Sequence, residues 1–210
     1  MASIAKAVEE YMMRNPAVKH CISRGMINFS SLSRRIIREK GLDSSDFDAV
    51  LIACRRYRDE AAKQGAHTAK AKDILAKSRL EVKTGIVVFV IEKDVYFDLL
   101  IDVGRKIKRE REMFQVIEGT DTITLITTKQ FSKDIKDMFS RRIITENPGL
   151  AEIVIKTSKD IERTPGVVSY LASLLGAHDI NIFETMSTWT DTLFIISEND
   201  IEKALGVLKF

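Results

Sequence analysis

The stretch RTPGVVSYLASLLGAHDINIF, residues 163–183, decides the fold that this sequence predicts. From Val167 to Leu175 its apolar residues recur every three or four positions, which is the spacing of one face of a helix. Pro165-Gly166 stands at the start of this helix, and Gly176 ends it. An extended segment begins at Ile180, so the stretch predicts a helix that leads directly into a strand.

Short segments rich in β-branched residues flank this helix on both sides. AEIVIKT (151–157) precedes it, and INIFETM (180–186) and TLFIIS (192–197) follow it, joined by a turn at Thr188–Asp191. Apolar residues at helical spacing then predict a last helix over 201–208. The order is therefore strand, helix, strand, strand, helix.

The same order occurs upstream. An apolar run from Ile86 to Ile91 predicts a buried strand, and Leu99 to Ile107 follow helical spacing. MFQVIEGTDTITLITT (113–128) predicts two strands joined by a turn. A helix from Ser132 to Ile143 completes the order and is expected to stop at Asn147-Pro148-Gly149.

We interpret the repeated order as an internal duplication. It predicts an α+β fold with two ferredoxin-like βαββα units, residues 81–148 and 149–210, each with an antiparallel sheet. A complete unit needs a fourth strand, and Val207–Phe210 is short for one. Either the 151–157 strand completes one unit while it starts the next, or another chain completes the sheet.

The N-terminal part has a different character. Residues 1–62 contain only helical patterns, interrupted at Asn15-Pro16, Gly25 and Gly41, and predict a small all-helical domain. Residues 63–80 are rich in Ala and Lys and are expected to form a partly helical linker.

Composition and charge limit the class of protein. The chain has 210 residues, 45% of them hydrophobic and 30% charged, which is typical of a globular protein. No apolar run is long enough to span a membrane, and Cys21 and Cys54, the only cysteines, indicate a reduced, cytoplasmic protein. Residues 1–80 carry 16 basic and 9 acidic side chains, whereas the remainder carries 17 and 21. This asymmetry indicates two parts with different partners.

The sequence resembles the ACT domain family at specific motifs. Arg163-Thr164-Pro165-Gly166-Val167-Val168, followed by Asp179-Ile180-Asn181-Ile182, is most similar to the tandem regulatory ACT domains of aspartate kinases. The turn STWTDT (187–192) is also similar. The resemblance covers 151–208 by motif and 81–147 by element order, and it includes neither residues 1–80 nor a kinase domain. It implies that an amino acid or similar small effector binds near this motif.

The residues at the motif offer the chemistry that an amino acid requires. The N–H groups at the start of the helix suit a carboxylate, while Glu162 and other polar residues of the preceding loop suit an ammonium group. Because Gly166 has no Cβ, the backbone is expected to approach a ligand or a neighbouring strand closely there. Asn181 is expected to begin the next strand and to close the other side of the site. The predicted effector-binding residues are Ser158, Asp160, Thr164, Pro165, Gly166, Val167, Val168 and Asn181.

The corresponding loop of the first repeat, residues 92–98, lacks Pro-Gly and is assigned a structural role. No catalytic triad, metal-ligand spacing or phosphate-binding loop is recognisable, so no enzyme activity, cofactor or metal is predicted.

The helical domain suggests a second function. Two of its predicted helices are basic and are separated by a short turn at Gly41, an arrangement compatible with a helix-turn-helix. The residues that would contact DNA phosphates are Arg34, Arg35, Arg38, Arg55 and Arg56. Asp43, Asp46 and Asp48 would repel phosphate, and basic residues also stabilise helix C-termini.

The leading hypothesis is a non-enzymatic ACT-type regulatory protein. It binds an amino acid or similar effector, assembles as a homodimer or higher homo-oligomer, and signals through the helical domain or a partner. The alternatives are an amino-acid-responsive DNA-binding regulator and an interaction protein without a ligand. No membrane association is expected.

Overall fold

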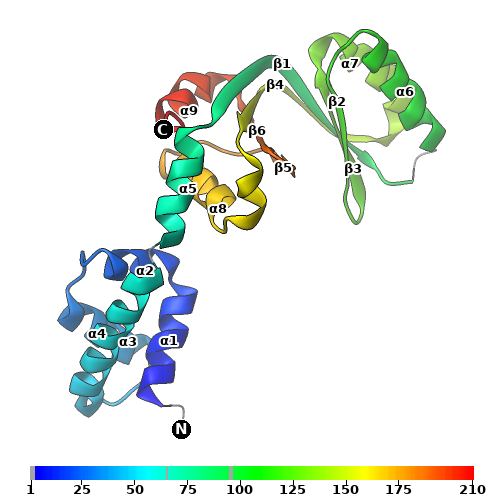
Figure 1. The fold of residues 1–210 in the computed structure, drawn as a ribbon. Helices are drawn as coiled ribbons and strands as arrows, with labels where there is room; N and C mark the ends of the chain where they lie inside the picture. The colour runs from blue at the N-terminus through cyan, green and yellow to red at the C-terminus, as the bar shows by residue number, and fades with distance from the viewer. Residues whose placement is uncertain (1–2, 65, 95–96) are drawn as a thin grey trace. The chain divides into compact units, whose positions relative to one another are not determined.

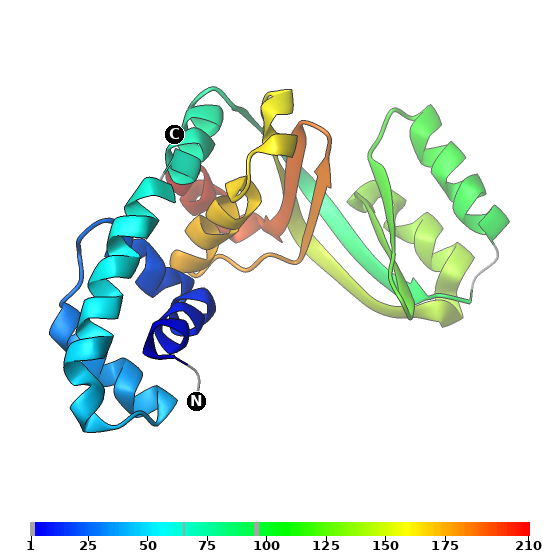
Figure 2. The same ribbon diagram turned by 60° about the horizontal axis from the view of Figure 1, so that its bottom comes forward.

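A computed structural model of the chain describes residues 3–64, 66–94 and 97–210 (Figures 1 and 2). By its internal contacts the chain divides into two compact units, Met1–Lys70 and Ala71–Phe210. Residue 65 of the predicted linker and residues 95–96 of the first-repeat loop lie outside the described residues.

The first unit is helical throughout its described residues. It contains α1 (Ile4–Arg14), α2 (Pro16–Ser23), α3 (Phe29–Lys40), a 3₁₀ turn (Ser44–Asp46) and α4 (Phe47–Gln64) (Figure 1). The fourth helix is longer than the short helix that the sequence suggests, since it continues to Gln64.

Side-chain caps and one glycine set the ends of these helices. Ser3 accepts a hydrogen bond from the Lys6 N–H at the start of α1, and Asn28 does the same for Ser31 at the start of α3. Gly41 ends α3 in the left-handed conformation, with φ of 62°. The buried side chains of the unit form one core, which consists of Val8, Tyr11, Met12, Ile22, Leu32, Ile36, Val50 and Cys54.

The second unit is built on one antiparallel sheet, which makes it an α+β structure. Its elements follow in the order α5 (Ala66–Ala76, which crosses the division between the units), β1 (Arg79–Glu92), α6 (Phe97–Arg109), β2 (Phe114–Glu118), β3 (Thr122–Thr128), α7 (Ser132–Phe139), β4 (Ile143–Lys156), α8 (Val167–Ala177), β5 (Glu184–Thr188), β6 (Asp191–Ser197) and α9 (Ile201–Val207). The six strands lie in the order β2-β3-β1-β4-β6-β5, and each neighbouring pair is antiparallel.

Strands β1 and β4 are the longest and run side by side through the whole sheet (Figure 1). The register of the pair shifts at Gly85 in β1 and at Pro148-Gly149 in β4, where both glycines have a positive φ. These shifts are β-bulges, because one strand carries an extra residue at each place. The expectation that Asn147-Pro148-Gly149 stops a helix is wrong, since all three lie within β4.

The bulges divide the sheet into two halves, each with its own core and helices. The part of β1 after Gly85 joins the β2–β3 hairpin, α6 and α7 around Phe89, Leu125 and Phe139. The part of β4 after Gly149 joins the β5–β6 hairpin, α5, α8 and α9 around Leu171 and Phe194. Figure 2 shows α6 and α7 together beside one half, and α8 and α9 beside the other.

The fourth strand of the second half comes from the start of β1. Arg79–Lys83 pair with Glu152–Lys156, while Val207–Phe210 form no strand. The first of the two alternatives holds only for the longer strand β4: its residues 143–150 pair with β1 in the first half, whereas 152–156, within the expected 151–157 strand, pair with the start of β1 in the second half. No second chain is needed to complete the sheet.

The helix-free face of the sheet is also buried. Ile86, Val88, Ile126, Leu150 and Ile195 form an apolar cluster on this face. The Gln115 Nε2 of β2 donates to Glu152 Oε1 of β4 at 2.7 Å, although these strands are not neighbours in the sheet. The sheet therefore bends at its bulges so that parts of its two halves face one another.

Among the described residues, no helix is long and apolar enough to cross a membrane.

Candidate functional site

The loop between β4 and α8 holds most of the predicted effector-binding residues. It begins with a 3₁₀ turn, Lys159–Arg163, which Ser158 caps by accepting a weak hydrogen bond from the Asp160 N–H at 3.4 Å. The Ser158 hydroxyl also donates to the Asp160 carboxylate at 3.2 Å. Both side chains are exposed, so the carboxylate can accept a further donor from solution.

Thr164 fixes the end of this turn. Its hydroxyl donates to the Asp160 carbonyl oxygen at 2.8 Å, and its N–H donates to the Ile161 carbonyl oxygen at 3.2 Å. The Thr164 side chain is buried, with 5% of its surface exposed. Its hydroxyl is therefore used to shape the loop.

Gly166 is the N-cap of α8 and has a left-handed backbone, with φ of 90° and ψ of −3°. A Cβ at this position would meet no atom within 4 Å. Glycine is required here because L-residues rarely adopt this conformation. The expected close approach of a neighbouring strand is wrong, and the approach of a ligand stays a prediction. The conformation turns the chain into α8 and leaves the first N–H groups of the helix without intrahelical acceptors.

The two valines at the start of α8 differ in exposure. Val167 is buried in the core of the second half, whereas Val168 is 40% exposed. No side chain caps the helix. Pro165 and Gly166 are exposed as well, so the positive end of α8 is open to a solute.

The structure does not bring Asn181 to this loop. Asn181 lies in an irregular segment three residues before β5, which corrects the expectation that it begins the strand. Strand β6 lies between β4 and β5. The start of β5, Glu184, is level with Glu152 of β4, because both pair with Ile195. The end of β5, Thr188, is level with Lys156 of β4, because both pair with Asp191. Asn181 therefore lies toward the end of α8 that is remote from Gly166.

A different segment lies beside the loop. Thr157 N–H and Thr157 Oγ1 both donate to the Thr190 carbonyl oxygen at 2.9 Å. The preceding residue in this turn, Trp189, is 70% exposed and has a φ of 45°. The turn was recognisable in the sequence, but its contact with the loop depends on strand register, which no local pattern specifies.

Charged residues surround the end of the sheet from which the loop leaves. Lys156 Nζ lies 2.9 Å from Glu81 Oε1. The Lys156 ammonium lowers the pKa of Glu81, while Glu81 and Asp191 raise the pKa of Lys156. Both side chains are a little under half exposed, so this ion pair is in contact with solvent beside the loop.

The arginines proposed to contact DNA lie on α3 and α4, and all are exposed. Two of them have partners within the unit. Arg34 stacks over the Phe47 ring at 5.5 Å, and Arg35 pairs with Glu39 at 2.7 Å. Arg38, Arg55 and Arg56 complete the set, and DNA binding stays a prediction. Within the described ranges, no group of three or more His, Cys, Asp or Glu side chains is placed to hold a metal ion.

No protein-family model matches the sequence, and no curated protein matches it. Solved structures do match its fold. The aspartate kinase of Clostridium acetobutylicum, called an allosteric enzyme, aligns with a TM-score of 0.52 and 15% identity. The alignment covers 62% of this chain and 33% of the kinase, so the chain spans about a third of that enzyme's length.

Two smaller proteins also align. The ligand-free regulatory subunit of Thermus thermophilus aspartate kinase has a TM-score of 0.49 and 14% identity, covering 61% of this chain and 92% of the subunit. A putative C-terminal regulatory domain of Porphyromonas gingivalis aspartate kinase has a TM-score of 0.47 and 14% identity, covering 63% and 95%. The match to the Clostridium acetobutylicum kinase, at a TM-score of 0.52, shows that part of this chain shares its fold with part of an aspartate kinase.

Proposed function

We propose that the second unit is an ACT-type regulatory module that binds an amino acid or similar small effector at the Ser158–Val168 loop. The observation that carries this proposal is the left-handed Gly166, which opens the start of α8 toward solvent. The effector's carboxylate binds the free N–H groups of Val167 and Val168. Its ammonium group binds the exposed Asp160 carboxylate. The fold likeness to an aspartate kinase described as allosteric supports the regulatory role.

The two halves of the sheet serve as two ACT-like units in this proposal. With β1 and β4 shared, each half has four strands and at least two helices, which supports a division near residues 81–148 and 149–210. Residues 1–62 then form a helical domain that receives the signal or docks a partner, and the linker ends before Ala71, because Ala71 and Leu75 of α5 lie in the core of the second half.

If Asn181 belongs to the effector site, the proposal requires assembly. Within one chain it lies away from the Gly166 end of α8, so it can complete the site only if a second copy supplies it. A homodimer or higher homo-oligomer therefore belongs to the proposal. Size-exclusion chromatography with light scattering tests it, because a monomer at every concentration and with every ligand would leave Asn181 outside the site.

A thermal-shift panel of the standard amino acids tests the effector site. We expect one amino acid, or a small related group, to raise the melting temperature, since a ligand that binds only the folded state stabilises it. A flat panel across all amino acids would contradict effector binding at this loop and favour an interaction protein without a ligand.

Two substitutions test separately the contacts to the carboxylate and to the ammonium group of the effector. Val168→Pro removes one N–H from the first turn of α8, where proline is tolerated, and Val168→Ala is its control because it keeps the N–H. Asp160→Asn removes the charge that faces the ammonium group. We expect Val168→Pro and Asp160→Asn each to weaken the ligand-induced shift, and Val168→Ala to retain it.

A further inference from the structure

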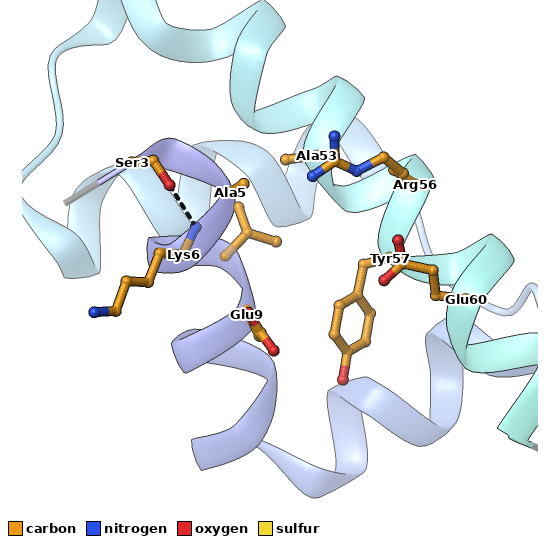
Figure 3. A pocket seen from close by; sticks show the side chains of 9 residues that line it. Ser3, Ala5, Lys6, Glu9, Ala53, Arg56, Tyr57 and Glu60 are labelled. Carbon is orange, nitrogen blue, oxygen red and sulfur yellow. Dashed lines mark hydrogen bonds between the residues drawn. The ribbon is translucent and has the colours of Figure 1, made fainter.

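A second candidate site lies in the first unit, away from the effector loop. A cleft of about 350 Å³ separates the start of α1 from the middle of α4 (Figure 3). Ala5, Val8 and Ala53 supply its apolar lining. This volume is within the range of small-molecule sites, about 300–1,000 Å³.

Charged side chains of both signs stand around this cleft. Figure 3 shows Glu9 on the α1 side, Tyr57 and Glu60 on the α4 side, and the Arg56 guanidinium beside Ala53. Lys6 also contributes to the lining, but its ammonium group extends away from the gap (Figure 3). Three charges, two negative and one positive, therefore remain at the opening.

These three charges have no ion-pair partner among the residues that the structure describes. Among the described residues, Glu9, Arg56 and Glu60 take part in no ion pair, whereas Lys40 pairs with Glu10 and Arg58 with Asp59 in the same unit. Burial, followed by the Glu9 and Glu60 carboxylates, raises the pKa of Tyr57. Both carboxylates thus lie within electrostatic reach of one phenol.

We propose that this cleft binds a small aliphatic molecule that carries an ammonium group at one end and a carboxylate at the other. The ammonium group has three donors, which Glu9 and Glu60 share, and the Tyr57 ring offers a face to the cation. The Arg56 guanidinium takes the carboxylate in a two-pronged contact. The methylene chain lies on Ala5, Val8 and Ala53, where it leaves water.

Three matched probes test this assignment on the full chain. The probes are 5-aminopentanoate, pentylamine and pentanoate, which share a chain and differ in their charged ends. Two-dimensional ¹H–¹⁵N NMR of the labelled protein reports where each binds. We expect 5-aminopentanoate to shift amides of residues 3–9 and 53–60, with a dissociation constant on the order of 1 mM because the cleft is open. Each single-ended probe is expected to bind about tenfold more weakly.

Variants distinguish the cleft from general charge attraction. Arg56→Gln and Glu60→Gln should each weaken 5-aminopentanoate about tenfold, while the adjacent Arg55→Gln, which changes charge outside the cleft, should bind as the unaltered chain does. Circular dichroism confirms that each variant is folded. The proposal is overturned if no amide near the cleft shifts, if pentylamine or pentanoate binds equally well, or if Arg55→Gln has the effect of Arg56→Gln. None of these outcomes bears on the effector loop, whose amides lie in the second unit.

Discussion

Thr157 donates two hydrogen bonds, one from its N–H and one from its Oγ1 hydroxyl, to the carbonyl oxygen of Thr190, at 2.9 Å each. Thr157 follows the last residue of β4, and Thr190 lies in the turn between β5 and β6. The pair therefore ties the start of the effector loop to the turn that carries Trp189, the only tryptophan of the chain.

Thr157→Val should loosen this connection. The substitution keeps the N–H bond and the side-chain shape but removes the hydroxyl donor, and we expect a loss of about 0.5–1.5 kcal/mol in the free energy of unfolding. Urea titration followed by circular dichroism measures the loss. Thr157→Ser, which keeps a hydroxyl, is the control, and equal stability of the valine and serine variants would show that the Oγ1 bond contributes nothing.

Two glycines of the same segment should respond in opposite directions to alanine. Gly166→Ala places a Cβ on a left-handed residue and is expected to lower stability by about 1–2 kcal/mol, although the space is open. Gly176→Ala lies within α8, also meets no neighbour, and should raise stability by about 0.5 kcal/mol. Thermal melts of both variants check the signs, and a gain in Gly166→Ala would contradict the assigned backbone conformation.

Glu152 joins the two halves of the bent sheet and should be costly to remove. Its carboxylate is fully buried, accepts from Gln115 and faces the Lys83 ammonium group at 3.1 Å, as an ion pair without an aligned hydrogen bond. Glu152→Ala leaves the Gln115 amide without its acceptor, and we expect a loss of about 2–3 kcal/mol.

Glu81→Ala is the matched control for Glu152→Ala. Glu81 also pairs with a lysine across β1 and β4, but its side chain is 48% exposed. Its removal should change the denaturation midpoint less than Glu152→Ala does. If the two variants were equally destabilised, the bridge from Glu152 to Gln115 would have no special role.

Glu184 should make stability fall as the pH rises. Burial raises the pKa of Glu184, while its hydrogen bond from Thr124 opposes that shift. The folded chain therefore keeps this proton more readily than the unfolded chain, and stability is lost as pH rises from the unfolded pKa through the folded one. Glu184→Gln should gain stability relative to the unaltered chain between about pH 4 and pH 7. Unfolding titrations across this range measure the difference, and a gain that grows toward low pH would reverse the assignment.

The sequence predicted most elements of the second unit because each has its own local pattern. The apolar spacing from Val167 to Leu175 defines α8, and the β-branched run from Ile86 to Ile91 lies within β1. Asn147-Pro148-Gly149 was misread because a helix stop and a strand bulge use the same residues. Only pairing with β1, which is remote in sequence, distinguishes them.

The candidate site shows the same limit. Gly166 could be assigned to the start of a helix because Pro-Gly has a local conformational preference. The separation of Asn181 from Gly166 could not be assigned, since it follows from the direction of β5 relative to β4. The contact between Thr157 and Thr190 depends on the register of β4 and β6, which is equally non-local.

The strand shared between the two halves also affects how the chain is made. The first residues of β1, Arg79–Lys83, leave the ribosome long before Glu152–Lys156, the segment with which they pair. During that interval Leu80 and Val82, which later pack against the second core, remain without partners. The second half can close only after both ends of the sheet have been translated, so its folding is slow and non-local compared with that of the helical unit. A pause in synthesis between β1 and β4 would therefore prolong the exposure of this strand to chaperones and to aggregation.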